Sequence, residues 1–269
     1  MSAALDLTSV LAVGIPASLY AAGSFKLWGR GGRIPLWQLL CGAAGFLVLA
    51  LTLLSPLHEI GERLFSAHMI EHEILMAVAA PIIVLARPAL PILWGIPRFA
   101  RRAIGITSRR IADSLLFRAI ARPSSATILH GAAIWLWHAP ALFGAGLASE
   151  GMHWLQHASF FFTALLFWWS MLVQSPDEHN QGTAIGHLFA TAMHTGLLGA
   201  LLTFSTRLWY PPALGAVDWG LNAIEDQQLA GLVMWIPGAA SYALAALWIA
   251  GRWIASAPHP MRRDYALGD

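Results

Sequence analysis

The stretch LWQLLCGAAGFLVLALTLLSP, residues 36–56, carries no charged side chain. A helix needs about 20 residues to cross a lipid bilayer, so this stretch is long enough. Further apolar segments of similar length occupy residues 7–28, 64–86, 123–141, 151–174, 184–205 and 228–251. Lipid cannot satisfy exposed backbone groups, and the alternating pattern of barrel strands is absent. The sequence therefore predicts an all-α integral membrane protein, a bundle of about seven transmembrane helices.

The composition of the whole chain agrees with a membrane protein. Of the 269 residues, 57% are hydrophobic and 11% are charged, whereas a soluble domain carries roughly a quarter charged residues. We expect residues 1–269 to form a single transmembrane domain without a soluble module. Because no basic residue precedes the first apolar run, that run is interpreted as an uncleaved anchor. No nucleotide-binding or hydrolase motif is present, so we do not expect an enzyme.

The basic residues are distributed unevenly among the connections between these segments. With seven spans, all sixteen lysines and arginines except Arg63 and Arg207 fall on one side of the membrane. The positive-inside rule makes that side cytoplasmic. This places the amino terminus outside and the carboxyl terminus in the cytoplasm, as expected for a multi-pass protein of the bacterial cytoplasmic (inner) membrane.

Residues 87–122 are too basic to cross the bilayer. Ile104, Ile111 and Leu115 recur at helical spacing, and arginines surround them. The pattern predicts an amphipathic segment on the cytoplasmic surface that is attracted to anionic lipid. Because contact with lipid accounts for these arginines, no nucleic-acid partner is expected.

Eleven histidines in so apolar a chain are its most informative feature. Polar side chains inside a membrane are costly and usually face a partner or a cavity. Two pairs have the spacing His-x-x-x-His: His68 with His72, and His153 with His157. Residues four apart share one helical face, so each pair can present two imidazoles to one metal ion. One such pair alone is more often packing, but two pairs at matching depth predict a metal or haem site that opens outward.

Other side chains at comparable depth extend the predicted site. The predicted metal ligands are His68, His72, His138, His153, His157 and His194. The predicted accessory residues are Met69, His130, Met193, Asp226, Gln227 and Met234. Imidazole suits copper, zinc and iron, and thioether favours Cu(I). These donors leave copper, zinc and iron open, and haem as well.

Acidic and amide side chains near the outer ends of the spans allow two interpretations. Residues 225–228, with the sequence EDQQ, either begin a helix with favourable dipole charge or orient a ligating imidazole. Glu71, Glu73 and Glu150 are expected to border the outer mouth, where they attract a cation or remain solvated. Pro81, Pro140 and Pro237 are predicted to mark kinks or helix ends.

Five motifs occur in a specific order between about residues 64 and 240. They are His68-Met69-x-x-His72 with Ala80-Pro81, Trp137-His138-x-Pro140, His153-x-x-x-His157, Met193-His194, and Asp226-Gln227-Gln228-Leu229-Ala230-Gly231 before Met234-Trp235. Their order and spacing together resemble the caa3-type cytochrome c oxidase assembly factors, the CtaG-like polytopic membrane proteins. An unrelated single-span copper chaperone shares that name, and this chain does not resemble it.

The resemblance implies an assembly factor that handles copper for a haem–copper cytochrome c oxidase. Its partner would be an oxidase subunit in the membrane, docking on the aromatic surface around Trp168 and Trp169. Two alternatives remain open: a membrane cytochrome with bis-histidine haem ligation, and a copper or other metal transporter in which His130 and His194 continue a path inward. The oligomeric state is not predicted.

The orientation can be tested with topology reporters. A reporter fused after Asp269 should report the cytoplasm, whereas reporters inserted near Glu150 or Asp218 should report the outer side, because basic connections stay inside. An inside location for the loop that contains Asp218 would overturn both the helix count and the placement of the site.

Overall fold

The computed structural model describes residues 7–32, 34–174, 178–210 and 216–256, with the side chains of 178–180 excepted. Within these ranges all regular secondary structure is helical. In the first half, the helices are α1 (Leu7–Trp28), α2 (Leu36–Leu54), α3 (Pro56–Gly61), α4 (Phe65–Glu73), η1 (Ile74–Ala79), α5 (Ala80–Leu85), α6 (Ala89–Gly95), α7 (Arg98–Asp113) and α8 (Leu115–Ile120). They continue with α9 (Pro123–Trp137), α10 (Pro140–Ala148), α11 (Glu150–Leu172), α12 (Glu178–Thr203), η2 (Ala216–Trp219), α13 (Ala223–Val233), η3 (Met234–Gly238) and α14 (Ala239–Ser256).

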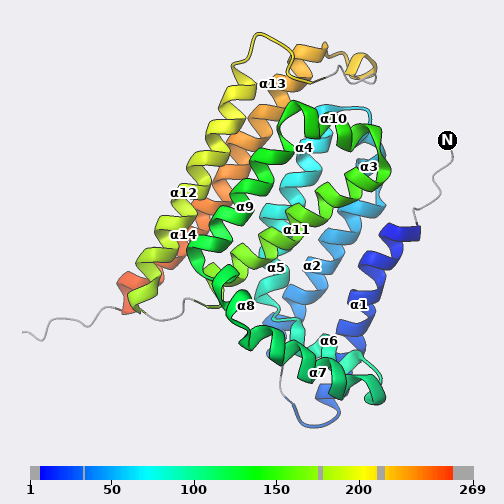
Figure 1. Cartoon of the computed structure of the whole chain (residues 1–269), viewed down its shortest axis with the longest axis vertical. Helices are drawn as coiled ribbons and strands as arrows, with labels where there is room; N and C mark the ends of the chain where they lie inside the picture. Colours follow the sequence, from blue (N-terminus) through cyan, green and yellow to red (C-terminus); the bar gives the residue numbers. More distant parts are fainter. Residues whose placement is uncertain (1–6, 33, 175–177, 211–215, 257–269) are drawn as a thin grey trace, which may run out of the picture.

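Long helices form an elongated bundle, and short helices cover both of its ends (Figure 1). Among the described residues, five helices are long and apolar enough to cross a membrane: Leu7–Trp28, Leu36–Leu54, Phe65–Leu85, Gln181–Thr203 and Ala223–Ser256. The bent pair α9 and α10 makes a sixth if it is counted as one span. The expected segment 151–174 forms the 23-residue helix α11, in which His153, Gln156 and His157 dilute the apolar character. The all-helical membrane architecture is thus confirmed, with five to six spans supported by length and composition.

The span Phe65–Leu85, made of α4, η1 and α5, lies at the centre of the bundle. Of its most apolar stretch, 61% is buried inside the protein, compared with 22–39% for the other qualifying spans. It packs against α2, α3, α11 and α13. Side chains on this helix are therefore surrounded by protein on several sides, which makes it the natural place for a polar site within a membrane.

Two π-helical turns interrupt the spans, and each is associated with a proline. Pro81 follows η1 directly at the start of α5, and Pro237 lies inside η3. Proline lacks the N–H of a normal helical hydrogen bond and its ring clashes with the preceding turn. Widening the helix to a π turn relieves that clash, as expected for a proline-linked distortion. The third predicted break is also present, since α9 and α10 meet at 73° just before Pro140.

Glycines allow two spans to approach until their backbones touch. A Cβ atom on Gly199 of α12 would lie 2.6 Å from the backbone nitrogen of Trp235, and one on Gly231 of α13 would lie 2.6 Å from the carbonyl oxygen of Gly199. Small residues at such crossings are the usual basis of close helix packing in membranes. This contact holds α12 against α13 and η3.

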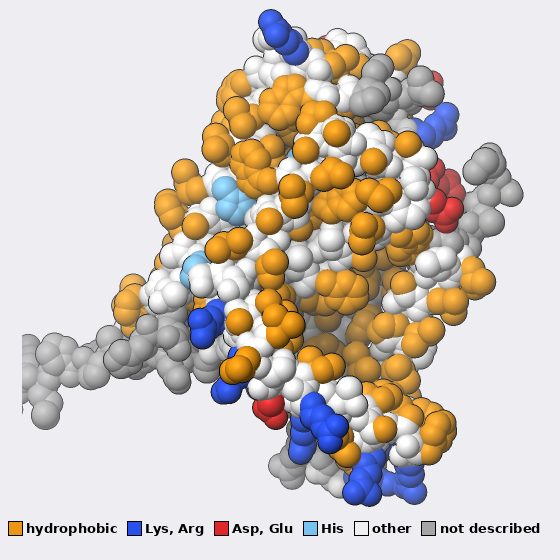
Figure 2. All heavy atoms as spheres, viewed as in Figure 1, with side chains coloured by type: hydrophobic (Ala, Val, Ile, Leu, Met, Phe, Trp, Pro, Cys, Tyr) orange, Lys and Arg blue, Asp and Glu red, His pale blue; other side chains and the backbone are white. Residues whose placement is uncertain are grey.

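The basic segment at 87–122 is helical throughout most of its length. Arg87 adopts a left-handed conformation, with φ of 49°, and ends the run of helix that includes α5. The chain then forms α6, α7 and α8 at one end of the bundle, and α7 has no buried residue. Lysine and arginine side chains gather on this end in Figure 2, and few are visible at the other. Arg33, Arg262 and Arg263, expected on the same side, lie outside the described residues.

The close contact between Gly199 of α12 and Gly231 of α13 can be tested with a matched pair of substitutions on α12. Gly199→Ala forces a Cβ into backbone atoms, so we expect a loss of about 1–3 kcal/mol, as for an overpacked core. Gly186→Ala is the control, because nothing lies within 4 Å of a Cβ at that position. Thermal unfolding in detergent measures both variants. Equal midpoints for the two variants would show that the α12–α13 crossing is not close-packed.

Candidate metal centre

The two histidine pairs face each other across α4 and α11. Within the pairs, the ring centroids of His68 and His72 are 4.2 Å apart and those of His153 and His157 are 4.4 Å apart. Between the helices, His72 and His157 are 4.9 Å apart, and His68 and His153 are 5.4 Å apart. Four imidazoles therefore form one packed cluster.

Most of the cluster's nitrogen atoms have no hydrogen-bond partner. Both ring nitrogens of His68 and of His72, and Nε2 of His153 and His157, are buried without a partner among the described residues. A buried polar atom without a hydrogen bond costs free energy. Nearly all such atoms in native proteins are satisfied, so each exception calls for an explanation such as an ion. A soft or borderline metal ion would satisfy these nitrogens by coordination.

Glu71 and His58 belong to the same cluster. The Glu71 carboxylate is fully buried; its Oε1 lies 2.8 Å from Nδ1 of His58 and 3.7 Å from Nε2 of His157. Of the two interpretations of Glu71, the solvated rim charge is therefore excluded by its burial, and the attraction of a cation stays open. His58, on α3, stacks on His153 with a centroid distance of 5.4 Å.

Sequence reasoning missed His58 as a site residue. The membrane-crossing stretch ends at about residue 56, and the short helix α3 after it carries no hydropathy signal. The only sequence feature that indicated His58 as a fifth histidine of the site was its position within 15 residues of His72. The side chain of His58 is 25% exposed and that of His157 is 6% exposed, so His58 is more accessible than His157.

His138 lies next to the cluster and is joined to Met69. Its Nε2 is 3.3 Å from the thioether sulfur of Met69, and its Nδ1 contacts the backbone oxygen of Ile134 at 2.7 Å. The hydroxyl of Tyr210 donates to the His138 carbonyl oxygen at 2.8 Å. Burial raises the pKa of Tyr210, so this hydroxyl stays protonated and available as a donor. An imidazole and a thioether in contact form a donor pair that suits Cu(I).

Four other predicted residues lie elsewhere. His130 is fully buried between Thr163 and Tyr242, at 3.2 and 3.0 Å from their hydroxyl oxygens. His194 is half-buried on α12, where its Nδ1 accepts from the indole of Trp135 at 3.3 Å. Met193 is 58% exposed on the outside of the bundle, and Met234 is buried in η3. The structure therefore does not bring these residues into the histidine cluster.

Asp226 and Gln227 bond to backbone rather than to an imidazole. The carboxylate of Asp226 accepts from the amides of Phe65 and Ser66 at 2.8 and 2.9 Å, so it caps the start of α4. Gln227 accepts from the amide of Trp209 and donates to the carbonyl oxygen of Arg207. A capping box between Asn222 and Glu225 begins α13 itself. Residues 225–228 are thus a helix start, and Asp226 in addition positions the helix that carries His68 and His72.

The cluster is not arranged around a single point in this structure. Among the residues described, no three His, Cys, Asp or Glu side chains form a group ready to hold a metal ion. The imidazoles contact one another as rings. Coordination would therefore require rotations of these side chains, which would exchange ring packing for metal–nitrogen bonds.

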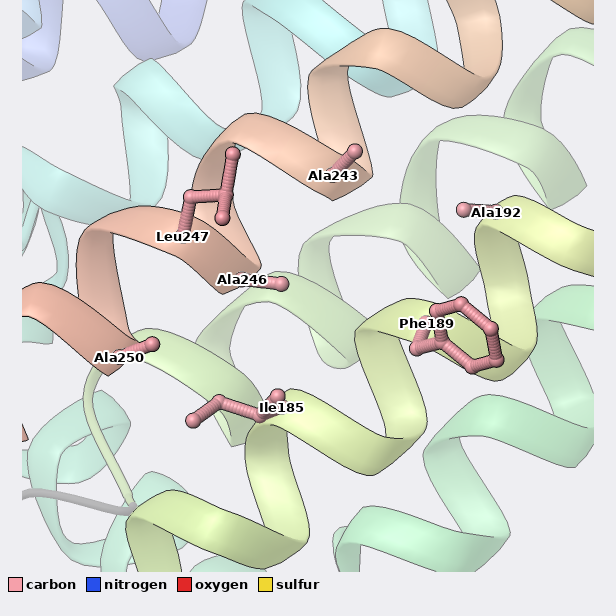
Figure 3. A pocket seen from close by; sticks show the side chains of 7 residues that line it. All are labelled: Ile185, Phe189, Ala192, Ala243, Ala246, Leu247 and Ala250. Carbon is pink, nitrogen blue, oxygen red and sulfur yellow. The ribbon is translucent and has the colours of Figure 1, made fainter.

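An apolar pocket and the side chain of Trp168 are also candidate parts of a binding surface. A pocket of about 330 Å³ between α12 and α14 is lined only by apolar side chains, so it offers no metal donor (Figure 3). Its lining consists of Ile185, Phe189, Ala192, Ala243, Ala246, Leu247 and Ala250. The expected docking surface around Trp168 and Trp169 is wrong at Trp168: this side chain is 2% exposed, stacks on Tyr242 and donates to the carbonyl oxygen of Met76 at 2.8 Å. Trp169 is partly buried.

The fold and the cluster together define a polytopic helical membrane protein with a buried group of imidazoles toward the end of the bundle that carries α3 and α10. The chain belongs to the cytochrome c oxidase caa3 assembly factor family, whose sequence model matches residues 18–256. The motif resemblance is thereby confirmed.

Similar curated proteins occur in mycobacteria. An uncharacterized protein of Mycobacterium bovis and one of Mycobacterium tuberculosis are each 27% identical to this chain over 240 residues. The match covers 84% of this chain and 34% of each relative, so the chain spans about a third of their length. No solved structure shows a significant match.

The capping role of Asp226 can be tested by Asp226→Asn. An amide offers one acceptor oxygen to two N–H donors and turns its NH₂ toward the other, so we expect a loss of about 1–2 kcal/mol, as for loss of a helix cap. Asp218→Asn is the charge-matched control, since Asp218 is exposed and its 3.8 Å pair with Arg63 should contribute little. Thermal unfolding measures both. Weaker metal binding by Asp226→Asn at unchanged stability would instead support a role in orienting a ligand.

Proposed function

We propose that this protein is a non-enzymatic assembly factor that binds copper at its histidine cluster and delivers it to a subunit of a haem–copper cytochrome c oxidase. The observation that carries the proposal is the set of buried, unpartnered nitrogens on His68, His72, His153 and His157. The family supports the assembly role, and copper is the metal that such an oxidase needs and that imidazole binds well.

The chemistry of the cluster suits a transiently held cation. Neutral imidazoles contribute donors without charge, and the buried Glu71 carboxylate contributes one negative charge beside His58 and His157. That charge offsets the desolvation cost of a buried cation. Glu71 also holds the ring of His58 at 2.8 Å, the usual arrangement by which a carboxylate orients a metal-binding imidazole. Met69 with His138 offers a further pair of soft donors beside the cluster.

The absence of a ready-made coordination geometry fits a delivery role. A cluster whose rings must rotate to bind the ion loses the free energy of ring packing on loading and regains it on release. The side chain of His58 is 25% exposed, whereas His68, His72 and His157 are buried, so copper would arrive and leave past α3. The receiving subunit would dock near that end of the bundle, on the outer side of a bacterial cytoplasmic membrane under the seven-span topology.

The two alternatives have less support from the geometry. A bis-histidine haem needs a porphyrin plane between two imidazoles from facing helices. The rings that face each other across α4 and α11 are only 4.9 Å apart for His72 with His157 and 5.4 Å apart for His68 with His153, which leaves no room for one. An inward metal path through His130 is disfavoured because both of its ring nitrogens contact hydroxyl groups, of Thr163 and Tyr242. A Soret band in the purified protein would nonetheless favour the cytochrome.

The copper site can be tested by single substitutions in the cluster. His72→Ala and His157→Ala should each lower copper affinity by more than the roughly 10–100-fold expected for Glu71→Gln, which changes only an orienting group. Cu(I) competition against a chromophoric chelator, with protein purified without a histidine tag, measures the affinity. In cells, the same variants should accumulate normally and leave the oxidase short of copper, with partial rescue by added copper.

His187→Ala and His194→Ala are the controls for this experiment. Each removes an imidazole from α12, outside the cluster, so neither should change the affinity for copper. The copper proposal fails if His72→Ala and His157→Ala bind copper like the parent protein and differ only by unfolding at lower temperature. His179 has no described side chain and His259 lies outside the described residues, so neither is used as a control.

A further inference from the structure

Four cationic side chains surround a small pocket at the end of the bundle that carries α6 and α7. Its lining consists of Lys26, Arg30, Trp94, Arg98 and Arg101, and its volume is about 170 Å³. Lys26 and Arg30 come from the end of α1 and the turn after it, whereas Arg98 and Arg101 come from the first turn of α7. Residues 70 positions apart in the chain thus converge on one point.

Backbone contact between α1 and α6 brings these residues together. A Cβ atom on Gly23 would lie 2.6 Å from the backbone nitrogen of Gly95, and one on Gly95 would lie 2.2 Å from the carbonyl oxygen of Leu19. Only glycine permits this approach, as in other close crossings of membrane helices. The crossing places the next turn of α1, with Lys26, directly beside Trp94 and the start of α7.

The cations are held in place by groups that carry no charge. Lys26 donates to the carbonyl oxygen of Gly95 at 3.1 Å, and Arg101 donates to those of Trp94 and Ile96 at 2.9 and 3.1 Å. The guanidinium groups of Arg30 and Arg101 lie 5.0 and 4.6 Å from the centre of the Trp94 ring. Nε of Arg101 is buried and has no partner among the described residues.

Among the described residues, no carboxylate pairs with the cations of the pocket. Like charges gathered at one point repel, and burial strengthens the repulsion. The start of α7 adds to the positive potential, because no side chain caps its first N–H groups. An anion bound in the pocket would relieve the repulsion and satisfy the donors.

We propose that this pocket is a specific binding site for the phosphate group of an anionic phospholipid. Arginine matches phosphate geometry through paired N–H donors, and lysine adds a point charge. Phe25 and Phe99, the chain neighbours of Lys26 and Arg98, are 80% and 88% exposed and offer apolar surface for acyl chains. The site differs from general attraction of α7 to lipid, because only two of the arginines on α7 line it.

The test uses the purified full chain in a neutral detergent. Short-chain phosphatidylglycerol, short-chain phosphatidylcholine and inorganic phosphate are each titrated while thermal unfolding is followed. Phosphatidylglycerol should raise the midpoint of the parent, and phosphatidylcholine should not. Arg30→Gln/Arg98→Gln should weaken this binding by about 10- to 30-fold, the expected effect of removing two cations near an anionic headgroup. Neither guanidinium group makes a hydrogen bond within the part of the chain that the structure describes; Arg30 contacts the Trp94 ring. The variant should therefore fold.

Arg109→Gln/Arg110→Gln is the matched control, with the same loss of charge on the same helix away from the pocket. It should bind phosphatidylglycerol like the parent. Trp94→Leu, which removes the ring beside two guanidinium groups without changing the charge, should also weaken binding. Equal losses in the two double variants, or no response to phosphatidylglycerol, would overturn the site. Stabilisation by inorganic phosphate at the same concentration would show a site for free phosphate and overturn the assignment to lipid.

Discussion

The carboxylate of Asp226 joins two helices that are about 160 positions apart in the chain. The first N–H groups of a helix have no partner within that helix, and leaving them buried and unsatisfied would be costly. Asp226 satisfies those of Phe65 and Ser66, and its negative charge favours the positive end of the α4 dipole. The contact fixes the height of α4 against α13. His68 and His72 follow within the next two turns, so their depth in the bundle depends on this one interaction.

Glycine contacts provide the second constraint, because they fix the spacing of neighbouring helices. Gly199 with Gly231 locks α12 to α13, and Gly23 with Gly95 locks α1 to α6. In both contacts the backbone of the neighbouring helix occupies the space that a side chain at the glycine would need. The frame is therefore stiff at its edges, while the imidazoles at the centre are packed against rings that can rotate. A rigid frame around adaptable ligands is consistent with a cluster that loads and releases an ion.

Hydropathy and charge predicted much of the fold, since the segment expected at 36–56 forms α2 at Leu36–Leu54 and the segment at 64–86 forms the span Phe65–Leu85. Two helical histidine pairs were also enough to predict a cluster. Depth along a span does not say which way a side chain faces, however. His194 matched the cluster in depth and yet points toward Trp135. His58 was missed because α3 folds back over the cluster by tertiary packing, which leaves no periodic signal in so short a helix.

The two polar sites differ in a way that bears on how the protein is oriented. At the α3 end, the cluster combines imidazoles with one buried carboxylate and suits a cation. At the α7 end, four cations converge on a pocket and none of them pairs with a carboxylate of the described residues, which suits an anion. A cation approaching the α7 end would meet repulsion, whereas one approaching α3 would meet Glu71 behind His58. If the cluster binds copper as proposed, the charge distribution that suits an anion at the α7 end also directs the metal ion to the α3 end. A carrier that loads on one side of the membrane needs such an asymmetry, and in this fold it follows from where the charges lie, without a moving gate.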